Sequence, residues 1–337
     1  MTNATFALPD QMNPKPKISV LMITFNHARF IRQALDSVLA QKTDFAYEMV
    51  MGDDASTDGT GAILAEYEKK FPDRIRLLLR PKNIGMNANF ADTLAACRGE
   101  YVAVLEGDDY WTDNQKLDRQ TKFLDDHPEC ANCFHNVVVF SDDAGVAVKG
   151  YHAQPDGRQL MCAPDLPARF SQNDLIKRNY IPTCSVMFRR ACVKSLPAWF
   201  TKLHLGDHPL HILCTEHGLA AYLPEVMGAY RLHSSSVWSG KPQLHRMSRA
   251  LEMYAELDRY YQGRPQQMAL REERMIMLRD YVRLLHRDGQ IAEAGAAAGT
   301  YIKLGLLSPK ITLKDPSSLR RMFVLFCNLK LGRPGKS

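Results

Sequence analysis

The sequence predicts an α/β protein with a mixed, mostly parallel β-sheet flanked by helices and a helical C-terminal extension. Short apolar runs alternate with segments of helical periodicity through the first third of the chain. The first run, residues 17–25, is almost continuously apolar and β-branched, as expected of a parallel strand covered on both faces. From residue 243 onwards, long stretches of helical periodicity replace the strand-like runs.

The first part of the chain repeats a strand–helix unit, which is typical of a parallel sheet with helices on its faces. The helices are predicted from apolar residues that recur every three or four positions. Strands are predicted at residues 17–25, 48–51, 74–79 and 101–105, and helices at 30–41, 61–70 and within 83–97.

The remainder is predicted in the same way. Residues 151–170 are rich in turn-forming residues, and we expect a long loop there. The regular Met, Leu and Tyr positions of the C-terminal helices are interpreted as a core face. Strands are predicted at residues 131–140, 185–189 and 226–232. Helices are predicted at 116–126, 245–262, 266–287, 291–306 and 319–331, and a further helix is predicted to end at 214.

The composition is that of an ordinary globular protein, with 45% hydrophobic and 24% charged residues in a chain of 337. No apolar run approaches the ~20 residues of a membrane-spanning helix. Residues 1–16 are polar and hold three prolines, so we expect a flexible arm rather than a secretory signal. The eight Cys are scattered, which predicts reduced thiols and a cytoplasmic location.

Cys130 and Cys133, with His127 and His135 nearby, have a spacing that zinc sites use. These residues lead into a predicted strand, where successive side chains point to opposite faces. We therefore do not favour a zinc site.

Positive charge is concentrated at the end of the chain. Residues 241–337 hold 18 Lys and Arg against 9 Asp and Glu, whereas the first 240 residues carry a net charge of −3. This distribution argues against nucleic acid as a partner. The apolar and basic segment 319–331 fits either an anionic membrane surface, with peripheral attachment, or a packed terminal helix.

Polar clusters lie at the carboxyl ends of three of the predicted strands, at 24–26, 53–54 and 108–109. In parallel sheets, ligands bind beyond the carboxyl ends of the strands, so these residues are expected to share one edge. The first strand is not followed by Gly-x-Gly-x-x-Gly, and no Walker phosphate loop occurs in the first half. A dinucleotide site and a triphosphate loop are therefore not supported.

Glu106, Asp108 and Asp109 form an acidic turn directly after a buried strand. Three carboxylates in four residues repel one another and are costly to desolvate unpaired. A divalent cation bridging to a phosphate would relieve that cost. A solvated turn is the alternative, but the apolar strand before it and the aromatic pair after it favour a binding site.

These segments resemble, in order, the motifs of family 2 glycosyltransferases of the bacterial surface-glycan type, which have the GT-A fold and invert the anomeric configuration. The motifs are residues 18–26, 53–60, 83–85 and 107–111. The resemblance implies a catalytic domain at 17–240, with a nucleotide-binding half at 17–115 and an acceptor half at 116–240. It leaves 241–337 as a basic helical region.

The resemblance implies a donor site for a UDP-, GDP- or dTDP-sugar. Asp54 is expected to bind the nucleobase, and Asp108 to lie toward the ribose. Asp53 is included with this site, although it could simply cap the loop that follows. The remaining donor-binding residues implied by the resemblance are Thr24, Phe25, Asn26, Asn83 and Gly85.

The resemblance also implies a Mg or Mn ion bound by Asp109, with His233 reaching the metal or the diphosphate. Asp207 occupies the position of the catalytic base, but Gly206 replaces the first acid of the family's acidic pair. Asp207 could instead cap the helix that begins near Pro209.

The implied reaction is an in-line transfer of a sugar to an acceptor hydroxyl, with a carboxylate accepting the hydroxyl proton and the metal stabilising the departing diphosphate. The acceptor is expected to be a glycan or a lipid-linked glycan, in polysaccharide, lipopolysaccharide or capsule assembly. Two alternatives are a non-catalytic nucleotide-sugar-binding or scaffold protein and a sugar nucleotidyltransferase. The second is disfavoured because 25–28 is neither glycine-rich nor basic.

Overall fold

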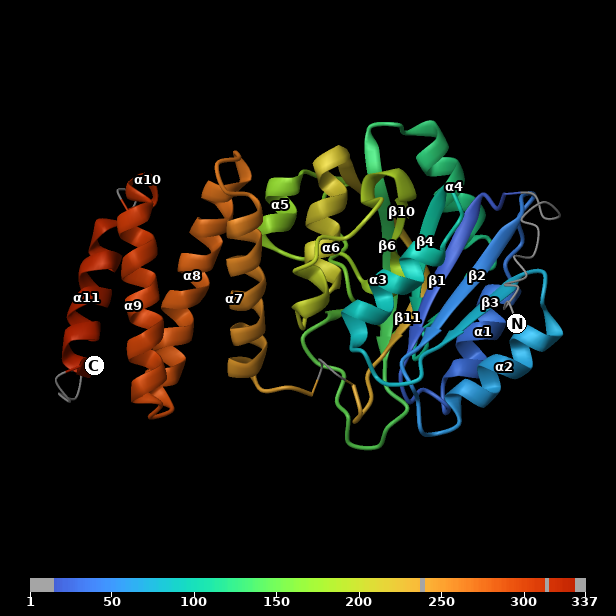
Figure 1. The fold of residues 1–337 in the computed structure, drawn as a ribbon, viewed down its shortest axis with the longest axis horizontal. Helices are drawn as coiled ribbons and strands as arrows, with labels where there is room; N and C mark the ends of the chain where they lie inside the picture. The colour runs from blue at the N-terminus through green and yellow to red at the C-terminus, as the bar shows by residue number, and fades with distance from the viewer. Residues whose placement is uncertain (1–14, 237–239, 313–314, 331–337) are drawn as a thin grey trace, which may run out of the picture. The chain divides into compact units, whose positions relative to one another are not determined.

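The computed structural model describes residues 15–236, 240–312 and 315–330 (Figure 1). The chain divides into two compact units. The first comprises Met1–Arg169, Ile181–Pro197 and Leu213–Leu232, and the second comprises Phe170–Tyr180, Ala198–Ile212 and His233–Ser337. Three segments of the predicted 17–240 domain thus belong to the second unit: residues 170–180, 198–212 and those from 233 onwards. Residues 1–14 of the predicted arm lie outside the described residues.

The first unit confirms the predicted alternation of strands and helices. α4 (Lys116–Asp126) has the predicted bounds, and the other early elements differ by a few residues at their ends. The strands and helices up to residue 140 are β1 (Ile18–Thr24), α1 (Ile31–Leu39), β2 (Tyr47–Asp53), α2 (Thr60–Lys70), β3 (Ile75–Leu79), α3 (Met86–Ala96), β4 (Tyr101–Glu106), β5 (Tyr110–Trp111), α4 and β6 (Cys130–Phe140).

The central sheet is mixed and mostly parallel, with the strand order β3-β2-β1-β4-β10-β6-β11-β5. β10 (Met187–Arg189) runs antiparallel between β4 and β6, and β11 (Leu219–Arg231) runs parallel to β6. β2, β1 and β4 are parallel neighbours. Their carboxyl ends therefore bring the predicted polar clusters to one edge of the sheet.

The packing of alternate residues of β1 shows which helices cover each face of the sheet. Ile18, Val20 and Met22 belong to the same buried cluster as the apolar residues of α1, α2 and α4, so these helices share one face. α3 packs on the opposite face at Gly52, where an added Cβ would lie 2.2 Å from Thr93 Oγ1. Every residue of β1 is buried as a result.

Two predictions for the middle of the chain differ in part from the structure. Residues 151–170 contain three two-residue strands, β7 (His152–Ala153), β8 (Gln159–Leu160) and β9 (Arg169–Phe170), where we predicted a loop. β11 begins at Leu219 rather than at 226. Pro224 interrupts the apolar run of β11, and the strand accommodates it with a register shift between Leu223 and Val226.

The second unit is helical, and its four long helices follow the predicted segments closely (Figure 1). The predicted Met, Leu and Tyr stripe is confirmed as a core face, because Tyr254, Met275, Leu278 and Val282 are buried. The helices that lie wholly in this unit are α5 (Gln172–Lys177), α7 (Gln243–Tyr260), α8 (Gln266–Arg287), α9 (Ile291–Leu307), α10 (Pro309–Thr312) and α11 (Pro316–Lys330), and most of α6 (Asp207–Cys214) belongs to it as well.

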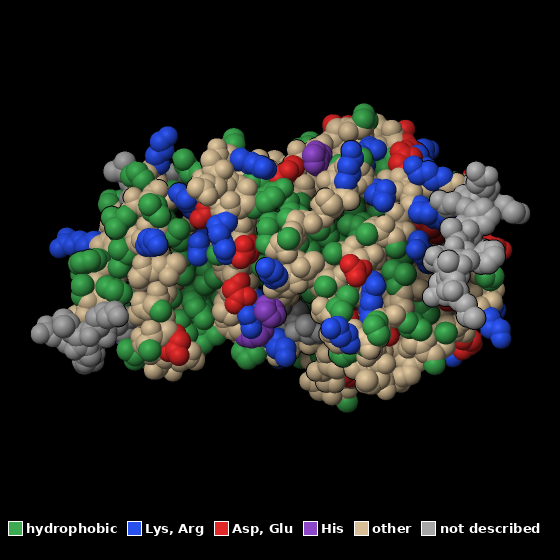
Figure 2. Space-filling view, in the orientation of Figure 1, with side chains coloured by type: hydrophobic (Ala, Val, Ile, Leu, Met, Phe, Trp, Pro, Cys, Tyr) green, Lys and Arg blue, Asp and Glu red, His purple; other side chains and the backbone are tan. Residues whose placement is uncertain are grey.

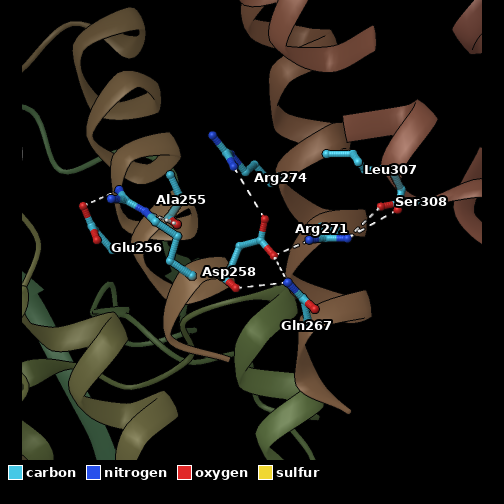
Figure 3. A network of polar contacts seen from close by, with 9 residues as sticks. Ala255, Glu256, Asp258, Gln267, Arg271, Arg274, Leu307 and Ser308 are labelled. Carbon is cyan, nitrogen blue, oxygen red and sulfur yellow. Dashed lines mark hydrogen bonds and ion pairs between the residues drawn. The ribbon is translucent and has the colours of Figure 1, made fainter. Parts of the chain in front are cut away.

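A polar network joins the helices of this unit (Figure 3). The Asp258 carboxylate, on α7, accepts hydrogen bonds from Gln267 Nε2 at 2.8 Å and Arg271 Nε at 2.9 Å. Arg274 Nη1 lies 3.8 Å from the same carboxylate. Arg271 also donates to the carbonyl of Leu307 at the end of α9, at 3.4 Å. The buried Asp258 carboxylate thereby joins α7 to α8, and Arg271 extends the network to α9.

None of the described helices is both long and apolar enough to cross a membrane.

Candidate functional site

The loops after β1 and β2 are bound to each other. Asn26 N donates to Ser56 Oγ at 2.8 Å, and Thr57 N donates to Asn26 Oδ1 at 2.8 Å. Asn26 has a φ of 58°, in the left-handed region that Asn tolerates better than most residues. Phe25 beside it is 43% exposed. The predicted residues Asn26 and Phe25 therefore lie on a fixed loop at the carboxyl edge of the sheet.

Asp53 is buried and its carboxylate is used within the protein. Thr24 Oγ1 and Ser56 Oγ donate to Asp53 Oδ1 at 2.9 and 2.5 Å, and Ser56 N donates to Oδ2 at 3.0 Å. This geometry fits the loop-capping alternative, and donor binding by Asp53 stays a prediction. Thr24, which is also buried, supports the same loop.

Asp54 holds the loop that contains Asn83 and Gly85. Its two carboxylate oxygens accept the amides of Ile84 at 2.7 Å and Gly85 at 3.0 Å. Asn83 Oδ1 accepts the Gly85 amide as well, at 3.1 Å. Gly85 has a φ of 91°, which favours glycine. The structure brings these three predicted residues together, with Asp54 shaping the loop before α3.

Gly107 allows the acidic turn to approach the β1–α1 loop closely. A Cβ on Gly107 would lie 2.7 Å from Thr24 Cγ2 and 2.9 Å from both His27 Nδ1 and Ile31 Cδ1. His27 Nε2 lies 3.7 Å from Asp108 Oδ2. The turn itself closes through the amide of Asp109, which donates to the carbonyl of Glu106 at 3.2 Å.

The two neighbouring acids of this turn have different environments. Asp108 keeps a side-chain exposure of 21%, whereas Asp109 is 2% exposed. Burial raises the pKa of the Asp109 carboxyl well above its usual range, and the charge of Asp108 adds to this. Asp109 Oδ1 accepts the backbone amide of Arg231 at 2.8 Å. One carboxylate oxygen of Asp109 is therefore used within the protein, and metal binding by Asp109 stays a prediction.

Arg231 is a residue that the motif comparison missed. It is 4% exposed, and its Nε donates to the carbonyl of Asp108 at 3.0 Å. Its position in the sequence gave one signal: an Arg at the end of an apolar strand, where charge is seldom buried without a partner.

Asp207 and His233 belong to the second unit and are described within it. Asp207 is the first residue of α6 (Asp207–Cys214), and its Oδ2 accepts a hydrogen bond from Asn179 Nδ2 at 2.7 Å. His233 is buried, with Nδ1 2.8 Å from Ser235 Oγ. These contacts leave both predicted roles as proposals.

Within residues 15–236, 240–312 and 315–330, no group of three or more His, Cys, Asp and Glu side chains is placed to hold a metal ion. Cys133 is instead part of the apolar core of the first unit. A separate depression of about 320 Å³ lies between α4 and β11 and is lined by residues including Phe123, His127 and Met227. None of the predicted site residues lines it.

Residues 19–195 match the family described as Glycosyl transferase family 2. The chain belongs to this family. TuaG of Bacillus subtilis, a glycosyltransferase named for teichuronic acid biosynthesis, is 31% identical over 232 residues, which are 68% of this chain and 84% of TuaG. An uncharacterised Mycobacterium tuberculosis protein is 42% identical over 222 residues, or 66% of this chain. The chain spans about 60% of the length of the mycobacterial relatives it matches.

Solved structures show that this family 2 chain has the GT-A fold. Staphylococcus aureus TarS 1–349 in complex with UDP-GlcNAc aligns with a TM-score of 0.61 at 16% identity, covering 94% of this chain and 92% of TarS. The mannosyltransferase PcManGT of Pyrobaculum calidifontis, in complex with GDP-Man and Mn²⁺, aligns with a TM-score of 0.56 at 18% identity, covering 97% and 88%. At these identities the likeness concerns the fold.

Proposed function

We propose that the chain is an inverting, metal-dependent glycosyltransferase that moves a sugar from a nucleotide-sugar to an acceptor hydroxyl. The observation that carries the proposal is the convergence of the Asn26, Asp54 and Asp108 segments at the carboxyl ends of three adjacent parallel strands, in a chain of family 2. Ligands bind at that edge in open α/β sheets.

The nucleobase of the donor is proposed to bind beside Asp54 and the Asn83–Gly85 turn. Because Asp54 fixes two amides of that turn, its role is to shape the base pocket and to face the base with its remaining lone pairs. Phe25, exposed on the next loop, offers an apolar surface to the nucleoside. UDP-GlcNAc in TarS and GDP-Man in PcManGT support a nucleotide-sugar without selecting the base.

A Mg or Mn ion is proposed at Asp108 and Glu106, in place of Asp109. These are oxygen donors, and Asp108 is exposed enough to reach a ligand. Such ions are usually held by one or two carboxylates together with substrate phosphates, so a cage of protein ligands is not required. The metal would supply Lewis-acid stabilisation of the departing diphosphate. His233 is retained as a proposed diphosphate contact.

Asp207 is the proposed base that accepts the proton of the acceptor hydroxyl. Its hydrogen bond from Asn179 would orient the carboxylate while one oxygen remains for the acceptor. Asp207→Asn is expected to lower transfer at least about 100-fold while nucleotide affinity changes less than about threefold. Asn179→Ala is the matched variant, because it removes the orienting bond but keeps the carboxylate. An Asp207→Asn enzyme that transfers sugar normally would exclude this base.

The acceptor is proposed to be a growing or lipid-linked glycan at an anionic membrane surface. Figure 2 shows hydrophobic side chains gathered over the C-terminal helices, with Lys and Arg among them. Phe323 and Val324 on α11 are each more than half exposed, next to exposed Arg320 and Arg321. Such a surface fits peripheral binding to acidic lipids. The name of TuaG supports polysaccharide assembly as the process.

Three experiments test the proposal. A thermal-shift screen with UDP, GDP and dTDP, each with Mn²⁺, should find one nucleotide that stabilises the protein by mass action. Incubation with the corresponding nucleotide-sugars should then release nucleoside diphosphate. No stabilisation by any of the three would contradict donor binding, and binding without turnover on any acceptor would favour a non-catalytic protein. For the membrane, flotation should recover the protein with vesicles containing phosphatidylglycerol but not with neutral ones.

A further inference from the structure

Arg231, the last residue of β11, holds the acidic turn from two directions. Its backbone amide donates to Asp109 Oδ1 at 2.8 Å, and its Nε donates to the carbonyl of Asp108 at 3.0 Å. One residue therefore fixes both acids of the turn, although it is more than 120 positions further along the chain. Because Arg231 binds the backbone carbonyl of Asp108, this hydrogen bond does not involve the Asp108 carboxylate.

The other side of the guanidinium is anchored equally well. Nη2 donates to Gln33 Oε1 on α1 at 2.6 Å, and Nη1 is paired with the Asp142 carboxylate. The guanidinium carbon lies 4.8 Å from the centre of the Phe30 ring and 4.7 Å from that of Phe140. A planar guanidinium that is held by these hydrogen bonds and packs against two aromatic rings has little freedom to move.

The charges explain why a cation is needed here. Glu106, Asp108, Asp109 and Asp142 all lie on or beside the turn, and Arg231 is the buried cation in direct contact with it. A buried guanidinium is stable only when its donors are satisfied, and here carbonyl, amide and carboxylate oxygens satisfy them. The buried guanidinium of Arg231 therefore neutralises part of the negative charge of the acidic turn from within the protein.

We propose that Arg231 is a positioning residue that aims the Asp108 carboxylate at the metal–diphosphate group of the donor. The inference rests on the proposed function of this site. Lys cannot replace Arg231, because a single ammonium cannot reach the Asp108 carbonyl, Gln33 and Asp142 together. The acceptor side of the reaction is not expected to depend on it.

Arg189 provides a matched control for a purely structural arginine. It lies at the opposite end of β4, where Nε donates to the carbonyl of Cys130 at 2.9 Å and Nη2 to that of Leu124 at 2.6 Å. It packs against the ring of Tyr101. Like Arg231, it holds backbone carbonyls with a forked guanidinium, but it does so away from the acidic turn.

The test measures Mn²⁺ binding by electron paramagnetic resonance of the free ion, with saturating UDP, GDP or dTDP, in wild type, Arg231→Lys and Arg189→Lys. We expect Arg231→Lys to bind Mn²⁺ at least about tenfold more weakly and Arg189→Lys to bind it normally, with similar losses of melting temperature. Excess Mn²⁺ should restore kcat in Arg231→Lys. Equal Mn²⁺ affinity in Arg231→Lys and wild type, or an equal loss of Mn²⁺ affinity in both variants, would overturn the proposal.

Failure of the wild type to bind Mn²⁺ with any of the three nucleotides would instead refute the proposed function, and this inference with it. If Arg231→Lys does not fold, Gln33→Leu replaces it. Gln33 is exposed on α1, and its loss removes only one of the bonds that hold the guanidinium. Gln33→Leu should weaken Mn²⁺ binding about threefold, and wild-type affinity in that variant would overturn the proposal.

Discussion

Replacing Gly107 with Ala tests whether close packing of the acidic turn is necessary for the fold. The added Cβ would lie within 3.0 Å of three side chains: Thr24, His27 and Ile31. The end of Ile31 is flexible, but Thr24 is β-branched and bound to Asp53, so it cannot turn away easily. Overpacking in a well-packed core costs ~1–3 kcal/mol, and three simultaneous contacts predict a loss of ~2–3 kcal/mol.

The loss should be measured by hydrogen exchange in peptides from β1 and β4, because these report on the first unit alone. Gly61→Ala is the control. Its Cβ would lie 3.4 Å from Leu79 Cδ2, an ordinary contact, and it sits in α2, so it should stabilise by ~0.5–1 kcal/mol. The two Gly→Ala substitutions are therefore expected to change stability in opposite directions.

A double-mutant cycle identifies the cause of the loss. Thr24→Ser removes Cγ2, the nearest atom, and keeps the hydroxyl that donates to Asp53. The Ser variant should therefore recover ~1 kcal/mol in the Gly107→Ala background, relative to its effect in the wild type. A loss below ~0.5 kcal/mol for Gly107→Ala, or strict additivity of the two changes, would refute the packing argument.

Three further predictions follow from buried polar groups. Asp54→Asn removes one of the two acceptors that hold the 83–85 turn, so nucleotide affinity measured by calorimetry should fall at least about tenfold; unchanged affinity would contradict the role of Asp54. Burial lowers the pKa of Lys116 in the folded state to about 7. Between pH 7 and 10.5 the unfolded state therefore binds one more proton than the folded state, so the free energy of unfolding rises with pH in this window. Lys116→Met should abolish a gain of ~1.5 kcal/mol between pH 7.0 and 8.5 in urea titrations, and an equal gain in the variant would rule out this origin. Asp258→Asn leaves Arg271 and Arg274 without their anion and should cost ~2–4 kcal/mol in urea unfolding of the helical unit, whereas a cost below ~0.5 kcal/mol would show that the network is not stabilising.

Much of the fold could be predicted because its elements carry strong local patterns. β1 is apolar along its whole length, and the α8 bounds followed from helical periodicity alone. The two-residue strands between 151 and 170 are too short to show any alternation, so they could not be distinguished from a loop. α5 was missed although its signal was present: Ser171 and Asp174 form a capping box.

The candidate site was predictable to the level of segments but not of individual atoms. Strand ends and acidic residues indicated which loops meet, and the structure joins them at Asn26, Asp54 and Asp108. Whether a carboxylate faces the ligand or the protein depends on donors supplied by other segments. Asp53 shows this, because one of its donors, Thr24, lies at the end of β1, whereas the other, Ser56, belongs to the loop that directly follows Asp53.

Asp108 and Asp109 illustrate the limit most clearly, because adjacent acids have the same local chemistry. The difference between them comes from β5, which begins directly after Asp109 and pairs with β11, Tyr110 opposite Ala229. That register places Asp109 beside the end of β11, where the Arg231 amide binds its carboxylate. The partner lies 122 positions away, so no local pattern contains it. Asp108 is the more exposed of the two acids, and Asp108→Asn is therefore expected to impair metal binding more than Asp109→Asn, whose main effect should be on stability.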